Sequence, residues 1–221
     1  MDENAVVLGL DTAGPVVGVA LVGAGEDRLW SVRATRGADA LILPALAAML
    51  DGVARLDGVA VSVGPGAFTS LRVGVAAALG IAMARGCPVV SVSSLYARAL
   101  AANRARVLAL LDGRKGKAYA AWYPDSGEVE AHDITPEEAV ALPDGPFVAT
   151  GEGAVVWRGL IEGAGGVVLD GADESPALAV ARYGRLNLEH AVAPDRVRLN
   201  YLRAADAMLP HRGPQSPPEL P

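Results

Sequence analysis

Apolar residues in the first half of the chain fall into short blocks separated by turn signals. The turn Gly14-Pro15 divides two apolar runs that predict buried strands, and the patterns that follow alternate between helix and strand. The predicted strands are 5–10, 16–22, 28–34, 58–63 and 88–92. The predicted helices are 39–50, 69–85 and 95–103, the first containing Pro44, which marks a kink or a later start. The order is therefore three strands, helix, strand, helix, strand, helix.

The same order begins again after residue 103, with weaker regularity. Thr135-Pro136-Glu137-Glu138 has the cap, first-turn proline and first-turn acids that open a helix. The predicted strands are 106–111, 118–123, 128–132, 146–150 and 167–169, and the later helices are 154–161 and 175–188. The pattern predicts two similar α/β halves, 1–103 and 104–209, without detectable sequence repetition. Residues 210–221 contain five prolines and predict a disordered tail.

Two predicted helices have no polar face. Every residue from 73 to 84 is Ala, Gly, Val, Leu, Ile or Met, and 40–50 is equally apolar. A helix that lies on a sheet normally presents a polar stripe to water. A partner subunit that covers the apolar surface would explain its absence, and so would an Ala-rich composition that leaves an ordinary core helix without polar residues.

Composition narrows the class of protein. The 221 residues are 52% hydrophobic and 20% charged, which excludes disorder throughout. The single cysteine, Cys87, forms no internal disulfide, and the acidic N-terminus is unlike a signal peptide. The 12-residue uncharged run at 73–84 is shorter than the roughly 20 residues of a membrane span, so a cytoplasmic protein without a membrane partner is expected. The net charge of −6 requires any nucleic-acid contact to be local.

Candidate chemistry is sparse. Asp11 and Thr12 end a strand, and Gly64 and Gly66 precede a helix, which are places where phosphate can bind. The second turn lacks both the third glycine of a dinucleotide fingerprint and the Gly-Lys pair of a Walker loop, so ordinary turns remain the alternative. The basic turn with Arg114, Lys115 and Lys117 is either an RNA contact or a solvated hairpin. The three histidines lack metal-site spacing, so no metal is expected.

Several motifs together resemble the bacterial TsaB family, also called YeaZ. They are Val7-Leu8-Gly9-Leu10-Asp11-Thr12, Gly64-Pro65-Gly66-Ala67-Phe68-Thr69-Ser70-Leu71-Arg72, Pro88-Val89-Val90-Ser91-Val92-Ser93-Ser94-Leu95, Leu111-Asp112-Gly113-Arg114-Lys115-Gly116-Lys117 and Tyr201-Leu202-Arg203. The resemblance implies an actin-like ATPase (ASKHA) fold with two duplicated βββαβαβα-type halves. It also implies a role in threonylcarbamoylation of the adenosine beside the anticodon of tRNAs that read codons starting with A.

In that family the chain is a non-catalytic partner of TsaD, joined by the ATPase TsaE, with tRNA bound through the complex. The resemblance places the TsaD interface on the first two helices, the pair without polar faces. The expected interface residues are Leu43, Leu46, Ala47, Leu50, Phe68, Leu71, Arg72, Gly74, Val75, Ala78, Ile81 and Ala82. No catalytic residue and no resident cofactor are expected, with weak ATP or ADP and Mg at the complex interface left open.

Three alternatives stay open at this point. One is an ATP-dependent phosphotransferase or ATPase of the same fold, with phosphate near Asp11, Thr12, Gly64 and Gly66. Another is an M22 glycoprotease-like peptidase, for which the sequence offers no catalytic constellation. The apolar helices also allow the lone protein to form a homodimer. For the scaffold hypothesis, Ala78→Glu is expected to abolish complex formation and leave the fold nearly intact.

Overall fold

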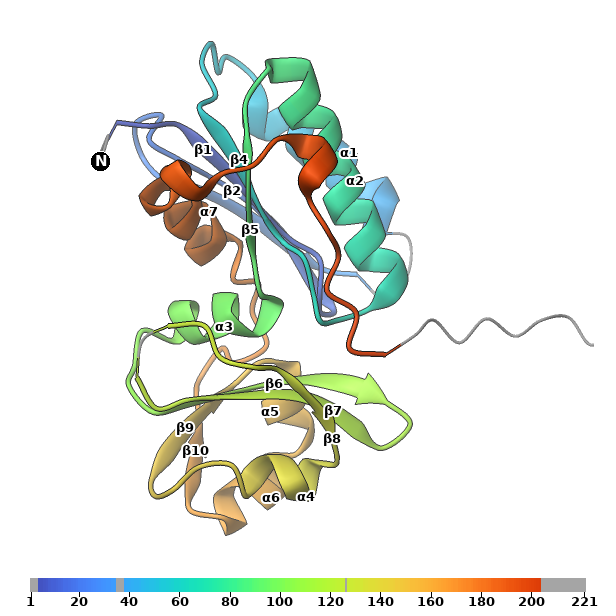
Figure 1. Cartoon of the computed structure of the whole chain (residues 1–221), viewed down its shortest axis with the longest axis vertical. Helices are drawn as coiled ribbons and strands as arrows, with labels where there is room; N and C mark the ends of the chain where they lie inside the picture. Colours follow the sequence, from blue (N-terminus) through green and yellow to red (C-terminus); the bar gives the residue numbers. More distant parts are fainter. Residues whose placement is uncertain (1–3, 35–37, 126, 204–221) are drawn as a thin grey trace, which may run out of the picture.

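Each half of the chain builds a five-stranded mixed sheet, and the two lobes lie one above the other along the long axis (Figure 1). The computed structural model describes residues 4–34, 38–125 and 127–203. The tail expected at 210–221 lies outside these residues.

The two sheets share one topology. The strands are β1 Val7–Asp11, β2 Val16–Val22, β3 Arg28–Arg33, β4 Gly58–Ser62, β5 Val89–Val92, β6 Val107–Arg114, β7 Lys117–Tyr123, β8 His132–Ile134, β9 Phe147–Thr150 and β10 Gly166–Val168. The first sheet has the order β3-β2-β1-β4-β5, and the second has β8-β7-β6-β9-β10. In both, the first strand pairs antiparallel with the second and parallel with the fourth. The duplication predicted from the element order is confirmed.

The helices match most of the predicted ones, with two differences, and one predicted strand is displaced. They are α1 Ala38–Leu50, α2 Phe68–Arg85, α3 Ser94–Ala102, α4 Pro136–Val140, α5 Glu152–Val156, α6 Arg158–Gly163 and α7 Ala177–Leu186. Helix α1 continues through Pro44. The single helix predicted at 154–161 is two short helices, because Trp157 leaves the helical region at φ −107° and ψ 29°. The strand predicted at 128–132 is instead β8, which starts at His132.

The last helix of each half packs on the sheet of the other lobe. Helices α1 and α2 cover one face of the first sheet, where they meet Leu8 and Leu10. Helix α7 covers the opposite face (Figure 1), and it approaches so closely that a Cβ on Gly9 would lie 2.5 Å from the backbone nitrogen of Ala181. Helix α3 lies between the lobes and packs on β6 and β7 of the second sheet. The boundary at 103/104 thus separates the repeated element orders but not the packed lobes.

Helix α2 buries one side against the first sheet and exposes the other, and its length and composition would also allow a membrane span. Five of its residues, Leu71, Gly74, Val75, Ala78 and Ala82, are buried inside the lobe. Gly74 is required there, because a Cβ would lie 2.2 Å from Oγ1 of Thr12. The helix packs on β4, β1 and α1, as a helix on a sheet does.

Candidate functional site

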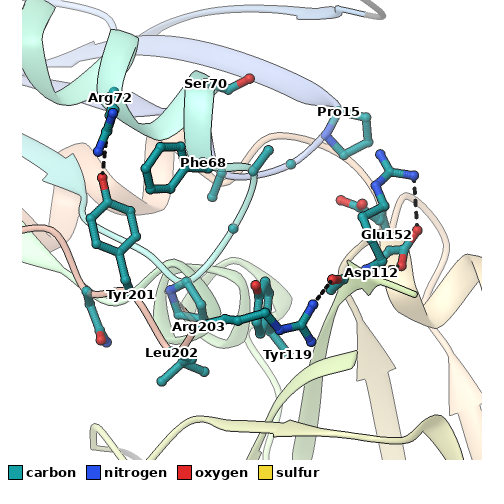
Figure 2. A pocket seen from close by; sticks show the side chains of 18 of the residues that line it. Pro15, Phe68, Ser70, Arg72, Asp112, Tyr119, Glu152, Tyr201, Leu202 and Arg203 are labelled. Atoms are coloured by element: carbon teal, nitrogen blue, oxygen red, sulfur yellow. Dashed lines mark hydrogen bonds and ion pairs between the residues drawn. The ribbon is translucent and has the colours of Figure 1, made fainter. Parts of the chain in front are cut away.

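A cleft of about 1010 Å³ opens between the lobes. The β1–β2 turn, the start of α2, the hairpin between β6 and β7, and the C-terminal segment at 200–203 form its walls (Figure 2). The fold therefore brings together three motifs that lie far apart in the sequence: the turn with Gly66, the basic turn with Arg114 and Lys115, and the segment Tyr201-Leu202-Arg203.

Asp11 and Thr12 are engaged inside the protein. Asp11 is fully buried, and its Oδ2 lies 3.2 Å from Nη2 of Arg98. Arg98, on α3, also donates from Nη1 to the backbone oxygen of Ser94 at 2.8 Å. The Thr12 hydroxyl donates to the backbone oxygen of Ser70 at 2.8 Å. Neither side chain is therefore available to a phosphate in this structure, because each polar group has an internal partner.

The two glycines of the predicted phosphate turn serve close packing. The Gly64 N–H donates to the Ser94 hydroxyl at 3.1 Å, and a Cβ on Gly64 would lie 2.3 Å from the backbone oxygen of Asn200. A Cβ on Gly66 would lie 2.5 Å from the backbone oxygen of Ala13. Of the two glycines, Gly66 lines the cleft. The turn therefore joins the start of α2 to the β1–β2 turn and to the C-terminal segment.

Glu152 lines the cleft from the start of α5. Burial raises its pKa to about 7, against the lowering effect of the nearby Arg98 guanidinium. Its Oε2 is buried and makes no hydrogen bond. No local motif points to Glu152, because its charged neighbours Arg98 and Asp112 are far from it in the sequence and meet it only when α3, β6 and α5 pack together.

Phe68, Arg72 and Tyr201 form one cluster in the cleft wall (Figure 2). The Arg72 guanidinium lies 3.8 Å from the centroid of the Phe68 ring, and its Nε donates to the Tyr201 hydroxyl at 3.1 Å. The Phe68 and Tyr201 ring centroids are 4.9 Å apart. Phe68 and Arg72 were expected at a helix interface, and the structure places them at the cleft because they stand on the first turn of α2.

The basic turn is the tip of the β6–β7 hairpin, and its three cations diverge. Arg114 and Lys115 have left-handed backbone conformations and line the cleft. Arg114 pairs with Asp112 at 3.2 Å. The backbone N–H and hydroxyl of Thr135 lower the pKa of Glu138 on α4, and the nearby charge of Lys117 adds a smaller effect. The structure therefore brings two of the three candidate RNA contacts into the cleft.

The C-terminal segment connects both lobes across the cleft. Asn200 donates its N–H to the backbone oxygen of Val63 in the first lobe at 2.8 Å. Arg203 donates from Nε and Nη2 to the two carboxylate oxygens of Asp133 in the second lobe, at 2.9 and 2.7 Å. Its Nη1 donates to the backbone oxygen of Gly113 at 3.1 Å. This segment holds Tyr201 between two anchored positions.

A second feature is the outward surface of α1 and α2, which we call the outer helix face. Its exposed residues are Leu41, Leu43, Pro44, Ala47 and Ala48 of α1, and Ala76, Gly80, Met83 and Ala84 of α2. Leu43 is 59% exposed and Met83 is 72% exposed. Of the expected interface residues, Leu43 and Ala47 belong to this face, and Leu50 and Ile81 are half-buried beside it.

Six expected interface residues lie inside the subunit instead. They are Leu46, Leu71, Gly74, Val75, Ala78 and Ala82. Ala78 is fully buried, so Ala78→Glu would place a carboxylate in the core and is no test of an interface. These residues attach the two helices to the sheet and thereby support the outer helix face from below.

Acidic, histidine and cysteine side chains do not cluster in the described residues in any group of three that could hold a metal ion. Cys87 is buried, and burial raises the pKa of its thiol. The buried charged groups that lie together are the Asp11–Arg98 ion pair, with Glu152 close to Arg98. This ion pair links β1 of the first lobe to α3, which lies between the lobes.

Comparison with known proteins identifies the family. The family model described as TsaD, tRNA N6-adenosine threonylcarbamoyltransferase, matches residues 36–144. The tRNA threonylcarbamoyladenosine biosynthesis protein TsaB of Escherichia coli is 31% identical over 188 residues, 77% of this chain and 81% of that protein. The protein of the same name from Haemophilus influenzae is 34% identical over 53% of each chain.

The solved structure of YeaZ from Pseudomonas aeruginosa matches with a TM-score of 0.75 and 27% identity, covering 90% of this chain and all of that one. The ethanolamine utilization protein EutJ from Carboxydothermus hydrogenoformans shares the fold alone, with a TM-score of 0.53 and 13% identity. Sequence, topology and structural likeness agree. The chain has the actin-like ATPase fold and belongs to the TsaB (YeaZ) family of tRNA threonylcarbamoyladenosine biosynthesis proteins.

Proposed function

We propose that the chain is a non-catalytic accessory subunit that binds a TsaD-like catalytic partner through the outer helix face. In this proposal the complex, with TsaE as a further member, threonylcarbamoylates the adenosine next to the anticodon of tRNA in the cytoplasm. The observation that carries it is the exposure of Leu43 and Met83 on helices that have no polar stripe. Burying one such side chain contributes about 1.5–3 kcal/mol, so a partner that covers several of them binds stably.

The sequence similarity of the chain to the catalytic subunit indicates the kind of partner. The TsaD family model matches residues 36–144, which include both α1 and α2, so this chain resembles the catalytic subunit in the region of the face. Related subunits can pair through equivalent faces, as the two halves of a twofold dimer do. For the same reason, we expect the lone protein to self-associate through this face when the partner is absent.

The internal engagement of Asp11 and Thr12 supports an accessory role over a phosphotransferase. A phosphate site would need the carboxylate and hydroxyl to face the cleft, whereas Arg98 and Ser70 occupy them. Calorimetric titration of the lone protein with Mg–ATP separates the two functions. The accessory role predicts no tight binding, and a stoichiometric micromolar site would favour the enzyme.

Co-purification with the TsaD-like subunit of the same organism tests the interface. Leu43→Glu and Met83→Glu each place a charge on the outer helix face without disturbing the core, so both should abolish recovery of the partner. Leu186→Glu is the matched control, because Leu186 is 51% exposed on α7, which packs on the other face of the sheet. Equal recovery with all three variants would reject the proposed interface.

A further inference from the structure

The cleft concentrates positive charge in an acidic protein. The chain carries a net charge of −6, yet five cationic side chains line the cleft against two acidic ones, Asp112 and Glu152. The cations are Arg33, Arg72, Arg114, Lys115 and Arg203. Three of them form ion pairs, Arg33 with Asp173, Arg114 with Asp112 and Arg203 with Asp133, so the excess of positive charge rests mainly on Arg72. Near neutral pH the balance is more positive still, because Glu152 is partly protonated there. A local patch of this kind attracts a polyanion despite the overall charge.

Aromatic rings gather in the same cleft. Phe68, Tyr119 and Tyr201 are three of only ten aromatic residues in the chain, and all three line it. Tyr201 is 38% exposed, so part of its ring is open to a ligand. The Arg203 guanidinium lies 6.0 Å from the Tyr119 ring on the other side (Figure 2). Cations interleaved with open rings are typical of surfaces that bind unpaired nucleic acid.

Arg72 is held in a fixed orientation. The Phe68 ring supports its guanidinium plane at 3.8 Å, and the bond from Nε to the Tyr201 hydroxyl sets its rotation. In the part of the chain that the structure describes, its two terminal amino groups make no hydrogen bond, and the side chain is exposed. A pre-oriented guanidinium of this kind binds a phosphate through two parallel hydrogen bonds.

We propose that the cleft binds an unpaired stretch of RNA, with a phosphate on the terminal amino groups of Arg72 and a base stacked on Tyr201. Arg114 and Lys115, at the tip of the β6–β7 hairpin on the opposite wall, supply charge for the neighbouring phosphates. The site uses residues other than those of the outer helix face, so it stands or falls independently of the proposed partner interface.

Two other ligands fit the cleft less well. A mononucleotide with a phosphate tail would need the groups around Asp11, Thr12 and Gly64, which are engaged within the protein. An acidic peptide would satisfy the cations but would leave the open Tyr201 ring without a stacking partner. An unpaired nucleotide chain uses both the cations and the ring.

Fluorescence anisotropy with a labelled single-stranded 12-nucleotide RNA tests the site on the full chain. Arg72→Ala should weaken binding about tenfold and reduce the salt dependence by the share of one phosphate contact, a slope of about 0.7. Tyr201→Leu should weaken binding about five- to a hundredfold through lost stacking. Tyr201→Phe keeps the ring and should lose only about two- to threefold. Arg158→Ala is the charge-matched control, because Arg158 lies on α6, away from the cleft.

The outcomes are distinct once the variants are shown to melt within a few degrees of the parent. Loss of binding with Arg72→Ala and Tyr201→Leu, and its retention with Arg158→Ala and Leu43→Glu, supports the site. Equal loss with Arg72→Ala and Arg158→Ala reduces the effect to net charge and overturns the proposal. Displacement of the RNA by stoichiometric ATP or by polyglutamate overturns it too, in favour of a nucleotide or an acidic peptide. Absence of RNA binding by the chain and by its complex with the partner also rejects it.

Discussion

The buried carboxyl of Glu152 should make the stability of the protein depend on pH. Burial raises its folded-state pKa from 4.5 to about 7. A carboxyl whose pKa is higher in the folded protein than in the unfolded chain favours the folded state at low pH, where it is protonated. This contribution to stability is lost as pH rises through the folded pKa. At about 1.4 kcal/mol for each pH unit between these two pKa values, the fold loses about 3 kcal/mol of stability between about pH 4.5 and pH 7.

Replacing Glu152 by Gln isolates this effect, because the amide mimics the protonated acid and cannot ionise. Urea unfolding of parent and variant at pH 5 and pH 8 should give nearly equal stabilities at pH 5 and a variant about 2–3 kcal/mol more stable at pH 8. Glu162→Gln is the control for the loss of one surface carboxylate, because that side chain is 52% exposed on α6. A Glu152→Gln variant that differs from the parent by the same amount at both pH values would refute the reasoning.

Three further predictions concern α7, α2 and α3. Gly9→Ala should destabilise the protein by about 1–3 kcal/mol in urea unfolding, because the new Cβ would lie 2.5 Å from the backbone nitrogen of Ala181 in α7. Gly80→Ala, in the open on α2, should instead stabilise it by about 0.4–1 kcal/mol, and a stabilising Gly9→Ala would contradict the close approach of α7. Arg98→Met should cost about 3–5 kcal/mol because it leaves the buried Asp11 carboxylate unpaired, and adding Asp11→Leu should recover most of that loss. A double variant as unstable as Arg98→Met alone would show that the cost comes from packing.

The alternation of apolar runs and turns predicted the duplicated topology, because each element carries its own period and punctuation. Thr135 caps α4 as predicted, in a capping box with Glu138, and the basic turn is the hairpin tip that the sequence allowed. Signals of this kind are local, so a single sequence reveals them.

The contacts between elements that are far apart in the sequence are not marked by any local pattern of residues. An amphipathic helix does not record which sheet it covers, so the placement of α7 on the first lobe could not be predicted from its own residues. In α2 the buried Ala78 and the exposed Ala76 have the same side chain, and periodicity could not assign the buried face. The partners of Asp11 and Thr12, Arg98 and Ser70, are 87 and 58 residues away, and this distance made a buried pair look like an open phosphate site.

Met83 can report directly on whether a TsaD-like partner covers the outer helix face. Met83 is 72% exposed on α2 and carries an oxidisable thioether. Hydroxyl-radical footprinting, read by mass spectrometry, should show its oxidation falling severalfold when the chain is saturated with the TsaD-like subunit, while oxidation of Leu186 on α7 stays constant. Unchanged oxidation of Met83 in the saturated complex would contradict the account.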